Sequence, residues 1–206
     1  SVDGSFATGG AVTAVMLING CPVWATIIVA ILAGLAAGLV TGLLHTLLGI
    51  PDILAGILTQ IALYSINLNI MGKSNLPISY RNYTLVVSAS NINMAILVGL
   101  GICAVVIAAM YCYFGTEQGS TLRSTGSHPA MSKAQGININ FTKVIALARS
   151  NGLVALSGSL FAQYQGFADI NMGRGAIVIG LAAVIIGEVL GEAIFRKHMN
   201  FIIRMV

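Results

Sequence analysis

Long apolar tracts without a charged residue dominate the chain. Asp, Glu, Lys and Arg are absent from Gly4 to Pro51, and also from Ile53–Gly72, Asn82–Thr116 and Asn151–Ala168. A helix needs about 20 mostly apolar residues to cross a hydrocarbon core of about 30 Å. The tracts hold four or more such lengths, so the pattern predicts an all-α, polytopic transmembrane protein.

Polar interruptions predict where the helices begin and end. Phe6–Ile18 is apolar but short, and we expect a capped or broken helix there rather than a full span. Full spans are expected at Trp24–Leu48, Ile53–Met71, Ile92–Phe114, Phe141–Tyr164 and Gly175–Leu190. The short turn at residues 49–52 makes the second span the antiparallel neighbour of the first. Gly34, Gly38 and Gly42 share one helix face, which predicts close approach of another helix.

Two glycine-rich stretches precede apolar segments, at residues 3–10 and 169–175. In each stretch an Asp lies ahead of Gly and small residues. The similarity reflects either a true repeat or two loops that became similar independently. Unwound backbone is tolerated at membrane depth only beside protein or water, so paired interruptions point to a translocation path. The predicted fold is therefore a transmembrane helical bundle with a broken or re-entrant segment. Val86–Val87 is expected to form a short strand or a re-entrant piece.

Several polar residues lie in or beside the spans and the two interruptions. They could line a path for solute, or they could hydrogen-bond neighbouring helices. The path candidates are Asp3, Ser5, Gln60, Asn67, Gln163, Asp169 and Asn171.

Composition agrees with a membrane location and excludes most soluble folds. The chain is 57% hydrophobic and 8% charged, against about 25% charged in an ordinary soluble domain. The net charge of +4 arises from basic residues scattered over loops without a basic face, which argues against nucleic acid as a partner. The three Cys and three His have no metal-ligand spacing, and no nucleophile is paired with a base. We therefore expect no catalytic residue, no metal and no cofactor.

The longest polar segment spans residues 115–143. Counting Lys and Arg in the loops favours placing it in the cytoplasm. Leu122–His128 reads as a turn, and Pro129–Gln135 as a short helix that begins at Pro and is stopped by Gly136. Ala130, Met131 and Ala134 would give this helix a small apolar face suited to a groove on a soluble partner. A solvated loop with incidental helicity is the alternative.

Particular residues of this polar segment carry a family resemblance. They are Arg123, Gly126, Pro129, Ala130, Ala134, Gly136 and Ile137. Residues 3–10, 157–163 and 180–188 extend the likeness over most of the chain. The sequence resembles the permease subunits of ATP-binding cassette (ABC) importers, in the group that includes ribose and branched-chain amino acid permeases. Within that group it looks closest to permeases for amino acids, of tryptophan or branched-chain type.

The resemblance implies a function and a set of partners. It implies one transmembrane permease domain over residues 1–206, with residues 115–143 as a cytoplasmic coupling loop. The first residue, Ser1 rather than Met, and the apolar run at residues 201–206 predict that this domain is a fragment of a longer chain. Such a subunit sits in the cell membrane and forms the path for a small polar solute, while a separate subunit hydrolyses ATP. The implied partners are that ATPase, an external solute-binding protein, and a second permease copy or paralogue. Met131 joins the family-matching residues of the loop as an ATPase-coupling candidate.

Two other functions stay open at the level of sequence. A secondary transporter or channel would need an ionisable relay or an ion site inside the bilayer, whereas the acidic residues here lie at segment ends. A non-transporting membrane scaffold would show the same apolar tracts.

Overall fold

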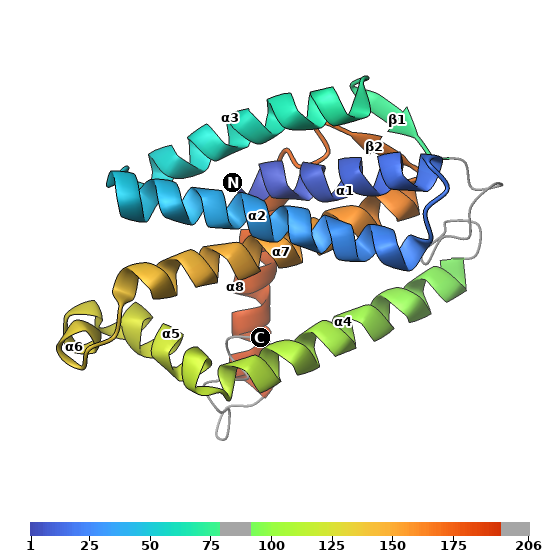
Figure 1. Ribbon diagram of the computed structural model, residues 1–206. Coiled ribbons are helices and arrows are strands. Elements are labelled where there is room, and N and C mark those ends of the chain that lie inside the picture. Colours follow the sequence, from blue (N-terminus) through green and yellow to red (C-terminus); the bar gives the residue numbers. More distant parts are fainter. Residues whose placement is uncertain (79–91, 195–206) are drawn as a thin grey trace. The chain divides into compact units, whose positions relative to one another are not determined.

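The computed structural model of the chain describes residues 1–78 and 92–194 (Figure 1). The described helices are α1 (Val2–Ile18), α2 (Val23–Leu48), α3 (Asp52–Met71), α4 (Ile92–Phe114), α5 (Glu117–Ser127), α6 (Pro129–Ala134), α7 (Ile139–Gln165) and α8 (Ala176–Ile194). The strands are β1 (Asn75–Pro77) and β2 (Phe167–Asp169). The expected strand or re-entrant piece at Val86–Val87 lies outside the described residues.

Among the described residues, α2, α3, α4 and α7 are long and apolar enough to cross a membrane. Their bounds confirm four of the predicted spans. A helix, α8, forms where the fifth span was predicted, but its apolar part, Ala176–Val189, is shorter than a full span among the described residues. Helix α1 is also shorter than a full span, as expected. The chain divides into two compact units. The first contains the described residues of 1–99 and 143–174, and the second contains those of 100–142 and 175–194.

Helices α1 and α7 of the first unit pack side by side and run parallel. Ser5 Oγ lies 2.6 Å from Asn151 Oδ1, and Thr13 Oγ1 lies 2.7 Å from Ser159 Oγ. Both pairs have the same sequence offset, so the helices keep one register over two turns. Hydrogen bonds between buried polar side chains are a typical way to join helices in lipid, where water exclusion gives little driving force.

Helix α2 packs antiparallel against α7 through the predicted glycine face. Gly34 lies against Asn151 and Ala155 of α7, whereas Gly38 lies further back along α7, against Leu147 and Ala148. A Cβ atom at either glycine would overlap these residues, so the close approach depends on glycine. This confirms the predicted close helix contact.

Strands β1 and β2 form a two-stranded antiparallel ribbon at one end of this unit. Asn75 pairs with Asp169, and Pro77 pairs with Phe167. A buried apolar cluster that includes Leu17 lies beside the ribbon. The chain is non-helical from Gly166 to Gly175, which confirms the predicted interruption at 169–175.

The other predicted interruption, at residues 3–10, is wrong. These residues are helical throughout and belong to α1. Their glycines serve contact rather than flexibility, since Gly4 lies against Leu63 of α3 and Gly9 against the Ala155 backbone of α7. A helix buried on several sides can keep glycine because tertiary packing outweighs its low helix propensity.

Helices α5 and α6 belong to the second unit. The turn expected at 122–128 is wrong for residues 122–127, which lie in α5. Thr116 caps this helix by accepting a hydrogen bond from the Gly119 N–H. The predicted short helix is confirmed as α6, with Pro129 in its first turn. Gly136 follows it with a φ of 82°, a left-handed conformation that glycine adopts without strain.

Candidate functional site

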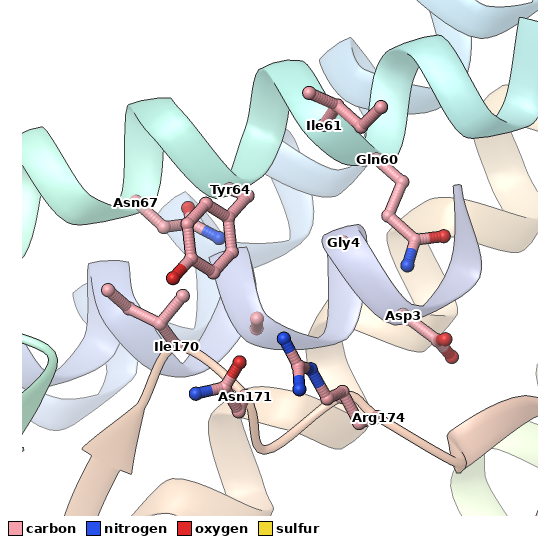
Figure 2. Close-up of a pocket in the computed structure, with 11 residues that line it drawn as sticks. Asp3, Gly4, Gln60, Ile61, Tyr64, Asn67, Ile170, Asn171 and Arg174 are labelled. Carbon is pink, nitrogen blue, oxygen red and sulfur yellow. The ribbon is translucent and has the colours of Figure 1, made fainter.

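A polar pocket of about 290 Å³ opens between α1, α3 and the segment 170–174, all within the first unit (Figure 2). It is lined by Asp3, Gly4, Ala7, Gln60, Ile61, Tyr64, Asn67, Ile170, Asn171, Gly173 and Arg174. Amide, carboxylate, phenol and guanidinium groups thus meet among helices that are otherwise mostly apolar.

Helix periodicity brings the α3 residues to the pocket. Gln60, Tyr64 and Asn67 follow one another at intervals of four and three residues, so they share one face of α3. Figure 2 shows Gln60 and Tyr64 extending from α3 toward α1 and the segment 170–174. Asp3 lies in the first turn of α1, close to the level of Gln60, because neighbouring Gly4 lies against the Gln60 backbone.

The segment 170–174 forms the remaining wall. Its turns are fixed by backbone hydrogen bonds from the Met172 N–H to the Asp169 carbonyl and from the Arg174 N–H to the Asn171 carbonyl. Gly173 lies directly on the backbone of Asp3. Non-helical backbone therefore approaches α1 closely, which places Asn171 and Arg174 at the pocket.

Two buried polar groups in the pocket lack hydrogen-bond partners among the described residues. Asn67 is 1% exposed, and neither its amide nitrogen nor its amide oxygen has a partner. The Oδ1 atom of Asp3 is also buried and unpartnered. Since most buried polar atoms in folded proteins are hydrogen-bonded, such exceptions call for a physical explanation.

The pocket also holds one side chain of each charge. Asp3 lies on α1, and Arg174 follows the ribbon. No ion pair joins Asp3 and Arg174 among the described residues. The two charges therefore do not neutralise each other.

The structure brings together four of the seven predicted path residues. Asp3, Gln60, Asn67 and Asn171 line the pocket, whereas the other three do not. Ser5 bonds Asn151 in the contact between α1 and α7. The other two are Asp169, whose Oδ1 accepts a hydrogen bond of 2.6 Å from the Asn171 N–H, and Gln163, which is buried on α7.

Sequence reasoning missed Tyr64 and Arg174. Tyr64 resembles an ordinary apolar-span residue, and Arg174 resembles a loop charge. The spacing of Tyr64 from Gln60 and Asn67 was the available signal for the first. For Arg174, no sequence signal shows that the segment 170–174 folds back onto α1.

A second pocket, of about 520 Å³, is apolar. It lies between α1, α2 and α3, and its lining includes Val12, Ala36, Val40 and Leu58, with Thr8 and Thr59 as the polar members. No charged side chain reaches it, so its lining offers little to orient a polar solute. Among the described residues, no group of three or more His, Cys, Asp or Glu could hold a metal ion.

The predicted coupling residues lie in or beside α5 and α6 of the second unit. Arg123 and Gly126 are in α5, and Gly136 ends the α6 turn. The apolar side chains of α6 are exposed, with Met131 62% accessible, whereas Ser132 is buried. The short helix therefore presents Ala130, Met131 and Ala134 outward.

A polar cluster joins three elements at the end of the first unit that holds the turn between α2 and α3. His45 Nδ1 lies 2.8 Å from Asp52 Oδ1 and 2.8 Å from the Ile50 carbonyl. His45 Nε2 lies 3.2 Å from Lys143 Nζ near the start of α7. Because the ammonium can only donate, Nε2 accepts and Nδ1 carries the proton.

Comparison with known proteins assigns the chain to a family. A family model described as "Branched-chain amino acid transport system / permease component" matches residues 1–195. A tyrosine transport system permease protein of Clostridioides difficile (strain R20291) is 46% identical over 191 residues, covering 92% of this chain and 63% of the relative. An uncharacterised protein of Rickettsia prowazekii (strain Madrid E) is 33% identical over 200 residues, covering 97% of this chain and 69% of that protein.

The chain thus spans roughly two thirds of the length of these relatives, and 63% of the tyrosine permease. No solved structure gives a significant match. The family match covers nearly the whole chain, and two relatives exceed 30% identity. The chain therefore belongs to the family of branched-chain amino acid transport system permease components.

Proposed function

We propose that this multi-pass membrane protein is the permease subunit of an ABC importer and carries an aromatic amino acid, tyrosine in the first instance. The observation that carries the proposal is the 46% identity to a tyrosine transport system permease over 92% of the chain. The polar pocket among apolar helices supports it, since a permease needs polar groups on the path of a polar solute.

The proposed path passes the pocket between α1, α3 and the segment 170–174. Asp3, Gln60, Asn67 and Asn171 contact the solute there, together with Tyr64 and Arg174. The energy input comes from a partner subunit. That partner is an ATPase, and ATP hydrolysis takes place on it rather than on the permease.

Helix α6 is the proposed contact for the ATPase. Its exposed Ala130, Met131 and Ala134 offer a small apolar face on the longest polar segment, for which the charge distribution favours the cytoplasmic side. The other proposed partners are an external solute-binding protein and a second permease copy or paralogue.

Uptake by the reconstituted complex tests the function. The full-length permease is purified with its ATPase, placed in vesicles and supplied with the binding protein. We expect labelled L-tyrosine to accumulate when ATP is hydrolysed, and no accumulation with a non-hydrolysable ATP analogue. Vesicles that lack the permease are the control.

Two results would contradict the proposal in different ways. Tyrosine movement driven by an ion gradient without ATP would identify a secondary transporter. A complex that neither transports nor hydrolyses ATP faster when loaded binding protein is added would identify a scaffold. Transport of a different amino acid under ATP would retain the importer and replace the solute.

A further inference from the structure

We propose that the pocket itself selects the solute: Arg174 and Asp3 hold the carboxylate and ammonium of a zwitterionic amino acid, and Asn67 hydrogen-bonds a polar group on its side chain. This inference rests on the proposed function and adds to it a set of residues that determine specificity within the permease. Selection would then take place in the membrane as well as on the external binding protein.

The unpartnered amide of Asn67 is the first argument. Asn67 is 1% exposed, yet both of its amide atoms lack a hydrogen-bond partner among the described residues. An amide can donate and accept at once, so a hydroxyl group is a suitable partner for it. A buried polar group without partners is costly, which favours a bound group that satisfies it.

The two charges that do not pair with each other are the second argument. Asp3 and Arg174 line the same pocket without an ion pair between them, and the buried Oδ1 of Asp3 has no partner. A ligand of a single charge would satisfy only one of the two side chains. A zwitterion satisfies both, because ammonium donates to Asp3 and the planar guanidinium of Arg174 pairs with carboxylate.

The layout along α3 orients the solute. Asp3 lies at the level of Gln60, and Asn67 is seven residues further along the helix, which corresponds to about 10 Å. Figure 2 shows Tyr64 between these two levels, and Ile170 near Asn67. The charged end of the solute therefore lies near Asp3 and Arg174, its body lies along Tyr64, and its polar tip reaches Asn67.

Direct binding to the permease tests this inference. The full-length permease and its ATPase are purified in detergent without the binding protein, so that only the membrane site is measured. Labelled L-tyrosine is the probe. The competitors are L-phenylalanine, which lacks the hydroxyl; tyramine, which lacks the carboxylate; and 3-(4-hydroxyphenyl)propionate, which lacks the amine. We expect unlabelled tyrosine to compete best.

Each variant has its own expected change in selectivity. Asn67→Leu should weaken tyrosine binding about tenfold and leave phenylalanine competition nearly unchanged. Arg174→Gln should remove the preference for tyrosine over tyramine, and Asp3→Asn the preference over 3-(4-hydroxyphenyl)propionate. Asn69→Leu, at an exposed amide on α3, and Lys73→Gln are matched controls that should bind as wild type.

The outcomes separate this inference from the proposed function. Wild-type binding with unchanged selectivity in all three variants would overturn the inference, as would the absence of binding to a complex that transports tyrosine with its binding protein. In both cases the proposed function stands. A failure of ATP-driven uptake by the complete importer overturns the proposed function instead. If Asn67→Leu does not assemble with the ATPase, Asn67→Ala gives the same test with a smaller side chain.

Discussion

Glycine determines how closely the helices of the first unit approach one another. Gly9 of α1 lies on the backbone of Ala155, and Gly158 of α7 lies on the backbone of Phe6. In lipid, helices associate largely through such close packing and through hydrogen bonds between them. Both kinds of contact join α1 and α7, so α1 is held along its length rather than at one point.

A Cβ atom at Gly9 should destabilise this packing. Gly9→Ala would place a methyl group inside the Ala155 carbonyl contact, and overpacking of this kind costs about 1–3 kcal/mol. Gly99→Ala on α4 is the matched control, because nothing lies within 4 Å of a Cβ atom there. Thermal unfolding in detergent should show a lower Tm for Gly9→Ala alone. An equal Tm for both variants would contradict the described contact.

At the scale of elements, α6 buries a polar residue and exposes apolar ones on a helix of six residues, too short to cross a membrane. Ser132 is buried, while Met131 is 62% exposed. Pro129 and Gly136 fix both ends of this short helix. A helix of this length gains little stability from its own hydrogen bonds. Its fixed ends and outward apolar face therefore suit a contact with another protein.

Acidic residues on the apolar face of α6 should release the ATPase. Ala130→Glu with Ala134→Glu introduces two charges that would be desolvated in the proposed contact, and burying unpaired charge is strongly unfavourable. We expect the ATPase to be lost on co-purification while membrane insertion is unchanged. Lys73→Glu with Ser74→Glu adds the same groups beside the ribbon and should retain the ATPase. Retention by the α6 variant would exclude this face as the docking site.

Some helices were predicted correctly from the sequence, and others were not. The spans α2, α3, α4 and α7 agree with prediction because the thickness of the bilayer dictates long apolar runs. Helix α5 was missed, since its Ser, Thr and Gly residues favour turns locally. In the structure the Thr116 cap begins it, and several hydroxyls, such as that of Thr121, bond carbonyls of the preceding turn.

The scale of the whole molecule shows why the site was predicted only in part. Gln60 and Asn67 were candidates because a polar residue stands out in an apolar span, and Asp3 and Asn171 because they lie in the two glycine-rich stretches. Their meeting depends on α1 lying beside α3 and on the segment 170–174 turning back onto α1. These are contacts between distant parts of the chain, which local pattern does not encode. Arg174 was missed for the same reason.

Within the first unit, the pocket and the polar cluster at His45 lie at different levels of α3. The pocket begins at Gln60 and extends to Asn67, whereas the cluster involves Asp52 at the helix start. Lys143 reaches the cluster from α7, and α7 follows the proposed coupling helix in the chain. Lys143, at the end of the proposed coupling segment, thus contacts His45 of α2, and His45 contacts Asp52 at the start of α3, which lines the pocket.

Removing this link should reduce coupling more than stability. Lys143→Met keeps the length of the side chain and removes the donor to His45 Nε2. The contact is exposed, and exposed polar pairs contribute at most about 1 kcal/mol, so the Tm should change little. If motion at α6 reaches α3 through this contact, tyrosine transported per ATP hydrolysed should fall by up to about fivefold, the factor that corresponds to 1 kcal/mol.

Binding of tyrosine to the detergent-purified complex should remain as in wild type, because Lys143 does not line the pocket. Lys73→Met, at the ribbon, is the matched control and should leave the transport ratio unchanged. An unaltered ratio in Lys143→Met would exclude the contact between Lys143 and His45 as the route from α6 to α3.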